Sequence, residues 1–515
     1  MKIIIHFLCL SLFFSFSGSA FAQWGPARII KTARDTIITI SPDYYMRAIS
    51  TDTFGRVHMV WFQEPIDTSG GSYSILCYQR STDGGGTWEA PVRLSLPNEG
   101  CYYPSISADG LGNVHVVWMT LHKGIPWVIL MDRRSTDGGQ SWLPETLLVD
   151  GSRYGNGVSA PSIAADERGD VHLVWIQLLS GGNNEVAYKR SSDCGVTWSS
   201  DTLLTNSPLL KWPVPIALDP QRNPHICWYE YAFPYPGRLW YKNSTDGGLA
   251  WNPSVMIADS DTTLPGAPNI AVDGLDRVYV FFTAYCGSKP DSTWAAQIVY
   301  RVSKDTGQTF GPRQPLTVYP ASPGPASVTA DFNGGVHAVW GDGPGSLLFY
   351  NGSTDGGVTW RFDPPFNLTD SFQGGWPSLT SDQTGSVHLV YRSGPGGPYT
   401  SWIIYRSGYP LGVEANPKGD FGGRDLARLE VYPNPVTSVA YLRVQVPSGS
   451  KASLKIFDIT GRLVRVLSSN LHSLKEVVVW DGKDGLGRSV PSGVYLCRLE
   501  GGGMGTRQKT LVLIK

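Results

Sequence analysis

The chain has 515 residues, in which Lys and Arg together number 42 and Asp and Glu together number 43. This balance provides no basic face, so it argues against nucleic acid and anionic membranes as partners. Gly (59), Trp (18) and Tyr (24) are abundant, whereas charged residues make up only 17% of the chain. Such a composition is typical of an all-β protein with many tight turns, and the length allows two or three domains.

The N-terminal stretch has the organisation of a secretion signal. Lys2 is followed by an apolar run from Ile3 to Phe16, and Ala20 and Ala22 form a small-x-small cleavage site. We therefore predict a signal peptide over residues 1–22 and a mature chain that begins at Gln23. No later stretch approaches the roughly 18 apolar residues of a membrane helix, so no transmembrane segment is predicted in the mature chain.

A hairpin motif then occurs seven times. In its first copy, residues 52–61, an Asp-x-x-Gly turn precedes the run Val-His-Met-Val-Trp. The turn predicts a connection between two strands, and the run that follows is apolar on both faces, as expected for a strand packed between two sheets. The copies begin at Asp52, Asp109, Asp166, Asp219, Asp273, Asp331 and Asp382.

A second motif alternates with the first and occurs six times at a spacing of 50 to 59 residues. Its pattern is Ser-x-Asp-x-Gly-x-Thr-Trp, first seen at residues 81–88. The aspartate can accept hydrogen bonds from loop amides, the glycine permits a positive φ, and the tryptophan supplies an apolar plug. We assign a structural role to the motif's aspartates, Asp83, Asp137, Asp193, Asp246, Asp305 and Asp355.

This loop resembles the Asp-box, or bacterial neuraminidase repeat, of sialidase-like β-propellers. The resemblance implies fold rather than function, because Asp-boxes occur on enzymes, lectins and inert scaffolds. Four strands for each repeat, at about 50 to 57 residues, are typical of a propeller blade. Seven hairpin motifs against six boxes predict seven blades over residues 23–410, whereas sialidases that carry Asp-boxes have six.

The two ends of this region predict how the ring closes. Residues 24–29 read like the segment that normally follows an Asp-box, and the last repeat stops at residues 403–407 with no box after it. The N-terminal strand should therefore form the outer strand of the last blade and leave no free sheet edge.

The C-terminal part is a separate unit. Residues 411–428 are Gly-rich and polar, as in a linker, and residues 429–515 contain seven short strand patterns, as in a small sandwich. Residues 432–435, 456–462, 480–484, 492–495 and 511–515 resemble the C-terminal sorting domain of type IX secretion and the related immunoglobulin-like domain of flagellar hook-capping proteins. The resemblance implies the type IX machinery as a partner and a secreted or surface-attached protein; an ordinary stalk domain is the alternative.

Histidine and cysteine do not predict a metal site or a cofactor. Six histidines recur at one position of the second strand, where neighbouring copies should lie roughly 10 Å apart, too far to share an ion. We interpret them as core or hydrogen-bonding residues. The six scattered cysteines of the mature chain are interpreted mostly as small buried hydrophobes, with Cys77 and Cys101 as the best pair for a disulfide.

Candidate ligand residues lie in the loops opposite the Asp-boxes. Arg47 replaces the proline that begins the inner strand at Pro104 and Pro161, and a sialidase would hold its substrate carboxylate with an arginine at this place. Aromatic rings there could stack on sugars or simply pack the loops together. The predicted ligand-binding set is Arg47, Tyr103, Trp127, Tyr154, Trp212 and Trp376.

Catalysis has weaker support. Glu230, Tyr231 and Asp342, with Arg153, Arg238 and Arg392, lie in loops of the same face, but the Arg-Ile-Pro motif that begins sialidase domains is absent. Other carboxylates considered for a glycosidase pair are Glu64, Glu99 and Glu185. The leading hypothesis is a glycan- or protein-binding module; the alternatives are an exo-acting, sialidase-like glycoside hydrolase and a purely structural surface protein.

Overall fold

The computed structural model describes most of the chain after the predicted signal peptide. The described ranges are 23–32, 36–39, 47–65, 74–96, 100–121, 127–231, 237–259, 264–288, 294–317, 323–342, 347–362, 365–369, 374–393, 402–409, 428–432, 440–446, 451–471, 476–501 and 507–513. The predicted signal peptide lies outside these residues, as does nearly all of the predicted linker.

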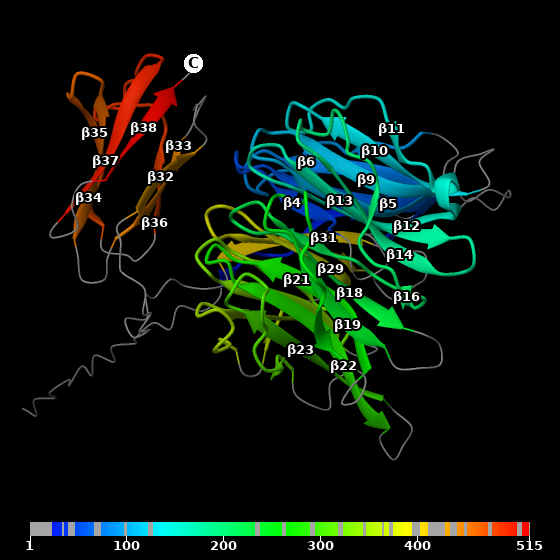
Figure 1. Cartoon of the computed structure of the whole chain (residues 1–515). Coiled ribbons are helices and arrows are strands. Elements are labelled where there is room, and N and C mark those ends of the chain that lie inside the picture. Colours follow the sequence, from blue (N-terminus) through cyan, green and yellow to red (C-terminus); the bar gives the residue numbers. More distant parts are fainter. Residues whose placement is uncertain are drawn as a thin grey trace, which may run out of the picture.

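Residues 23–409 form a seven-bladed β-propeller of seven antiparallel sheets, whose inner strands line a central channel. Figure 1 shows how the blades are arranged. Blade 1 contains β3 (Thr36–Thr39), β4 (Ile49–Thr51), β5 (Val57–Pro65), β6 (Ile75–Ser81) and β7 (Val92–Arg93). Blade 2 contains β8 (Gly100–Ala108), β9 (Val114–Leu121), β10 (Val128–Ser135) and β11 (Thr146–Val149). Blade 3 contains β12 (Gly155–Ala165), β13 (Val171–Leu179), β14 (Asn184–Ser191) and β15 (Thr202–Leu203). Blade 4 contains β16 (Leu210–Lys211), β17 (Ile216–Leu218), β18 (Pro224–Tyr231), β19 (Arg238–Asn243) and β20 (Val255–Ala258). Blade 5 contains β21 (Leu264–Val272), β22 (Val278–Ser288), β23 (Trp294–Ser303) and β24 (Gln314–Pro315). Blade 6 contains β25 (Ser327–Ala330), β26 (Val336–Asp342), β27 (Leu347–Ser353) and β28 (Phe366–Asn367). Blade 7 contains β29 (Gly374–Ser381), β30 (Val387–Ser393) and β31 (Trp402–Tyr409), together with β1 (Gln23–Trp24) and β2 (Arg28–Thr32) from the start of the described chain.

The ring closes as predicted. Strands β1 and β2 both pair antiparallel with β31, in a register that places Gln23 opposite Tyr409 and Arg28 opposite Tyr405. The first strands of the described chain therefore form the outer edge of the last blade, and the edge of β31 is covered.

Large side chains from the second strands fill the space between blades. Trp61, Trp118, Trp175 and Trp340 are almost fully buried, each within a cluster that includes residues of two neighbouring sheets. A strand that is apolar on both faces suits this position, because each face packs against a different blade. The predicted disulfide is absent: Cys77 and Cys101 are buried thiols in different clusters.

Serine hydroxyls join the inner strands around the channel. The amide of Ala48 donates to Ser378 Oγ at 2.9 Å, and the amide of Leu379 donates to Ser327 Oγ at 3.0 Å. The amides of Ala108, Ile163 and Ala165 donate in the same way to serines of the preceding blade. The serines of the inner strands thus supply bonds between blades.

The sequence predicts that the arginines before the Asp-boxes pack or bond within their own blade, and Arg80 Nε does donate to Glu89 Oε2 at 2.8 Å there; the same arginines also bond to neighbouring blades. Arg80 Nη1 donates to the Gly138 carbonyl at 2.7 Å in the next Asp-box, and Arg190 Nη1 donates to Gly247 at 2.6 Å in the same manner. Arg301 instead donates to the Ile257 carbonyl on the outer strand of the preceding blade, at 2.6 Å. Because the blades pack face to face, a long side chain that leaves one sheet meets the neighbouring sheet first.

The Asp-box loops share one hydrogen-bond pattern. In the first box Ser81 Oγ donates to Asp83 Oδ1 at 2.7 Å, and the Thr87 amide and hydroxyl donate to the same carboxylate at 2.7 and 2.8 Å. The Thr87 amide and the Ser81 and Thr87 hydroxyls lower the pKa of Asp83 to about 2, so the carboxylate is charged at neutral pH. The other five box aspartates accept from their own serine likewise.

Two glycines of the first box provide a matched test of packing between blades. Both have positive φ, but a Cβ on Gly85 would lie 1.9 Å from Tyr405 Oη, whereas a Cβ on Gly84 would meet nothing within 4 Å. We expect Gly85→Ala to lower the free energy of unfolding by about 2–4 kcal/mol, from backbone strain and a displaced tyrosine, and Gly84→Ala by about 1–2 kcal/mol. Chemical unfolding measures both; equal losses would show that the Tyr405 contact is unimportant.

The C-terminal unit contains the seven predicted strands. They are β32 (Arg428–Tyr432), β33 (Ala440–Gln445), β34 (Ala452–Asp458), β35 (Leu463–Leu471), β36 (Glu476–Trp480), β37 (Gly493–Gly501) and β38 (Arg507–Leu513). Two sheets, β32-β33-β36 and β35-β34-β37-β38, share one core that includes Leu442, Ile456, Trp480 and Leu511. Within the described part of the chain, no helix has the length and apolarity to cross a membrane.

Candidate functional site

The inner strands of the propeller enclose a cavity in the central channel. Its volume is about 230 Å³, and its walls come from the inner strands of blades 3 to 7 and from the start of the inner strand of blade 1. Small residues dominate this wall because the inner strands converge here and leave little room for side chains. Its polar groups are those of Arg47, Ser162, Asn269, Ser327, Thr329, Ser378 and Thr380.

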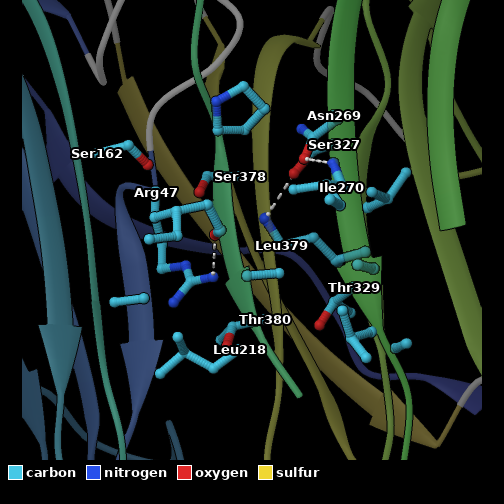
Figure 2. A pocket seen from close by; sticks show the side chains of 18 of the residues that line it. Arg47, Ser162, Leu218, Asn269, Ile270, Ser327, Thr329, Ser378, Leu379 and Thr380 are labelled. Carbon is cyan, nitrogen blue, oxygen red and sulfur yellow. Dashed lines mark hydrogen bonds between the residues drawn. The ribbon is translucent and has the colours of Figure 1, made fainter. Parts of the chain in front are cut away.

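Arg47 is the charged residue among the described residues that line this cavity. It leaves the inner strand of blade 1 and crosses the channel, where Nη2 contacts the Ile216 carbonyl of blade 4 at 3.5 Å. Figure 2 shows its side chain extending into the cavity, among the hydroxyls of Ser162, Ser378 and Thr380. Burial lowers the pKa of Arg47, but an arginine stays protonated in proteins, so the cavity holds a positive charge.

A repeated backbone feature marks the mouth of the channel. Tyr103, Ala160, Ala267 and Trp376 each precede the proline of an inner strand, and their φ angles lie between 48° and 51°. The pairing of the inner strand with the second strand shifts register at each of these places. A left-handed conformation at a residue with a side chain costs about 1–2 kcal/mol. Four blades thus keep a β-bulge that sets the residue at the rim.

Two of these rim residues are aromatic, and each contacts another residue that the sequence analysis singled out. Tyr103 of blade 2 meets Trp212 of blade 4 edge to face, with ring centroids 5.7 Å apart. Trp376 of blade 7 lies under the guanidinium of Arg392, which is 4.6 Å from the ring centroid. The rim therefore combines aromatic surface with a second cation, Arg392.

The other predicted ligand residues are placed separately. Trp127 precedes β10 and leaves 36% of its surface exposed. Tyr154 ends the short 3-10 helix η1 (Gly151–Tyr154), and its side chain lies outside the described part of the structure.

A buried ion pair anchors the segment that carries Trp212. Lys211 Nζ lies 3.0 Å from Glu185 Oε2 and donates to the carbonyls of Asn184 and Ser207 at 2.7 and 2.6 Å. The Ser207 amide donates to Glu185 Oε1 at 3.0 Å. Glu185, considered above for a glycosidase pair, is therefore occupied by a structural network that joins blades 3 and 4.

The candidate catalytic residues are distributed over several blades. Glu230 and Tyr231 end β18 in blade 4, whereas Asp342 ends β26 in blade 6. The Glu230 carboxylate is buried and accepts a hydrogen bond from Trp240 Nε1 at 2.7 Å, and Tyr231 stacks on Tyr229 with ring centroids 5.3 Å apart. Among the described residues, no group of three or more His, Cys, Asp or Glu side chains is placed to hold a metal ion.

Reasoning from sequence identified Arg47 but missed its reach to blade 4 and missed the Lys211 network. The first requires knowing which blades face each other across the channel. The second had a weak signal, since a lysine and a glutamate within the apolar repeats have no evident exposed position. The rim bulges were missed as well: a residue before a proline favours an extended conformation, whereas these four residues have positive φ.

The C-terminal residues match a known family. Residues 430–514 match the model of the secretion system C-terminal sorting domain, which confirms the predicted resemblance to the type IX sorting domain. No curated protein sequence matches the chain.

Solved structures resemble the propeller in fold. A polysaccharide lyase of family PL25, an ulvan lyase bound to -[GlcA(1-4)Rha3S]-, is 10% identical with a TM-score of 0.51, over 74% of this chain and 96% of its own. The Hadza microbial sialidase Hz136 is 16% identical with a TM-score of 0.40, over 67% and 75%. The α-L-arabinofuranosidase Arb93A from Fusarium graminearum is 15% identical with a TM-score of 0.43, over 59% and 92%.

Proposed function

We propose that this protein, whose sorting domain at residues 430–514 directs it through type IX secretion to the cell surface or the extracellular space, binds an anionic glycan over the mouth of the channel. In this proposal Arg47 holds the carboxylate or sulfate of one sugar. The rim aromatics contact the faces of the sugars beside it.

The observation that carries the proposal is the state of Arg47. Its side chain is only partly exposed to solvent, yet the described hydrogen bond is a single long one, to the Ile216 carbonyl at 3.5 Å. A guanidinium has five N–H donors, and a charge that has been removed from water is costly unless an anion or several acceptors satisfy it. Carboxylate and sulfate oxygens are the ligands that this planar fork binds best.

The size of the cavity limits what enters it. At about 230 Å³ it is smaller than the 300–1,000 Å³ typical of sites that enclose a whole small molecule. It therefore suits one charged substituent, while the rest of the ligand lies on the rim. Tyr103, Trp212 and Trp376 present rings at this level, and Arg392 adds a cation beside them.

The proposal is tested by Arg47→Gln on the mature chain, residues 23–515. Calorimetric titration would compare a uronate-containing oligosaccharide with its carboxyl-reduced form, and a sulfated ligand with its desulfated form. A hydrogen bond to a charged group contributes about 1.5–3 kcal/mol, so we expect the variant to bind the anionic ligand about 10- to 150-fold more weakly. The neutral forms should bind the two proteins equally.

Arg93→Gln is the matched control, because it removes the same charge from the outer strand of the same blade, where Arg93 donates to the Ser95 and Leu96 carbonyls. Equal affinity of Arg47→Gln and Arg93→Gln for the anionic ligand would reject the assigned role of Arg47. Turnover of any ligand would instead favour the glycoside hydrolase, with Glu230→Gln as the next variant. Failure to bind any glycan or protein would favour the structural alternative.

A further inference from the structure

A three-residue chain of hydrogen bonds recurs at the junctions between blades, on the Asp-box side. In blade 1, Asp52 Oδ2 lies 3.1 Å from His58 Nε2, and His58 Nδ1 lies 2.6 Å from Tyr78 Oη. Burial lowers the pKa of His58, so the neutral ring donates from Nε2 to the aspartate and accepts from the tyrosine at Nδ1. Blades 4, 6 and 7 repeat both contacts.

The tyrosine of this chain also seals the junction with the next blade. Tyr78 Oη lies where a Cβ on Gly139 of the second Asp-box would be, 1.8 Å away, and the ring meets Trp142 of that box edge to face at 4.7 Å. Tyr188, Tyr241 and Tyr405 contact the next Asp-box in the same way, with the box's aromatic residue 4.9 to 5.0 Å from the tyrosine ring.

The junction between blades 2 and 3 breaks this arrangement on both of its sides. Asp132 of β10 stands at the tyrosine position, three residues before the serine of the Asp-box. In the third Asp-box Cys194 stands where four of the six boxes have glycine, and its φ is 58°. Both departures were visible in the sequence, but only the structure shows that they lie at one junction, where Arg134 of β10 donates to the Cys194 carbonyl.

His115 loses both of its usual partners here. Its Nε2 is 3.8 Å from Asp109 Oδ2, which instead accepts a hydrogen bond from Asn113 Nδ2 at 2.6 Å. His115 is fully buried and Asp132 is 4% exposed, yet no described protein group bonds to either ring nitrogen or to Asp132 Oδ1. Buried polar groups without partners destabilise the structure that holds them, so this junction is weaker than those with the complete Asp-His-Tyr chain.

We propose that the junction between blades 2 and 3 is a pH-sensitive seam, at which the ring opens locally once Asp132 is ionised. The charged and titratable groups that act on Asp132 are His115 of β9 and Arg134 of β10, and Asp109 of the preceding turn lies beside His115. On the blade 3 side of the junction, Cys194 lies near Asp170 and Asp193, and Asp109 and Arg134 reach it from blade 2. Arg134 is held across the junction by the Cys194 carbonyl, and it remains beside the seam rather than on the Asp132 carboxylate.

The direction in which pH changes the opening of the seam follows from the burial of Asp132. Burial raises the pKa of Asp132 to about 6, whereas an opened seam returns the carboxyl to its ordinary value of 3.8. The closed seam therefore keeps its proton at a pH where the open seam has lost it, and closure weakens as the pH rises from about 4 to about 6. From these values, the equilibrium constant for opening should rise about tenfold between pH 5 and pH 8.

Hydrogen exchange with mass spectrometry on the mature chain tests the proposal at pH 5 and pH 8, with each rate divided by the intrinsic rate at that pH. We expect residues 128–135 and 191–198 to open more readily at pH 8. Residues 75–81 and 135–142, at the tyrosine-sealed junction of blades 1 and 2, should show no such change.

Two variants distinguish the effect of the Asp132 charge on opening from the effect of the tyrosine ring that is missing at this position. Asp132→Tyr restores the repeat and should give this seam the protection of the others at both pH values. Asp132→Asn removes the charge alone, so opening should stay more frequent than at other junctions but no longer depend on pH. A pH dependence that persists in Asp132→Asn, or a wild-type seam as protected as the others at both pH values, would overturn the proposal.

Discussion

Deletion of residues 23–32 is expected to leave a propeller that unfolds at a much lower temperature and aggregates. Strands β1 and β2 cover the edge of β31, and Trp24 and Ile30 pack into two different clusters. Partial burial of two such side chains contributes about 3 kcal/mol, and an exposed edge strand promotes association between chains. Thermal unfolding and light scattering would compare chains that begin at residue 23 and at residue 33.

Addition of the missing segment as a peptide gives this prediction its control. A synthetic peptide with the sequence of residues 23–32 should bind the shortened chain and raise its unfolding midpoint, whereas a scrambled peptide should not. If the shortened chain is as stable and monomeric as the complete one, strand closure does not hold the ring together.

Lys211→Met is expected to lower the free energy of unfolding by about 3–5 kcal/mol, because it leaves the Glu185 carboxylate buried without its cation. Both side chains are almost completely inaccessible, and the pair is 3.0 Å apart. The Asn184 and Ser207 carbonyls would also lose the donor that now satisfies them. Urea unfolding of the mature chain measures the loss.

The second member of the pair supplies the control. Adding Glu185→Gln to Lys211→Met removes the stranded charge but keeps an acceptor for the Ser207 amide, so at least half of the lost stability should return. A Lys211→Met variant with the same free energy of unfolding as the unmodified chain would show that the pair contributes nothing to stability. Because Trp212 follows Lys211 directly, the single variant should also weaken binding at the rim.

The propeller was predictable because its determinants are local and repeated. Each turn at positions such as Asp52 or Asp109, and each Asp-box, identifies a strand boundary. Seven hairpin motifs against six Asp-boxes predicted that β1 and β2 complete the last blade, as the structure shows. The strands of the sorting domain were predictable for the same reason, as alternating runs between short turns.

Features that depend on three-dimensional proximity could not be predicted in this way. Arg47 contacts Ile216, 169 residues away, because blades 1 and 4 face each other across the channel. The bonds that the arginines before the boxes make to neighbouring blades are a consequence of blade packing rather than of strand pattern. At the seam, Asp132 was a visible exception to the tyrosine of the other repeats, but its meaning depends on His115, which lies beside it without a described hydrogen-bond partner.

The account depends most on Arg47 as the residue that holds an anionic group at the channel. A crystal structure of the mature chain with a bound uronate-containing oligosaccharide tests this directly. We predict that a carboxylate oxygen lies within about 3 Å of the Arg47 guanidinium and that a sugar ring rests on Trp376 or on the Tyr103–Trp212 pair. An oligosaccharide bound on the Asp-box face or on the outer strands, with the channel unchanged, would contradict the account.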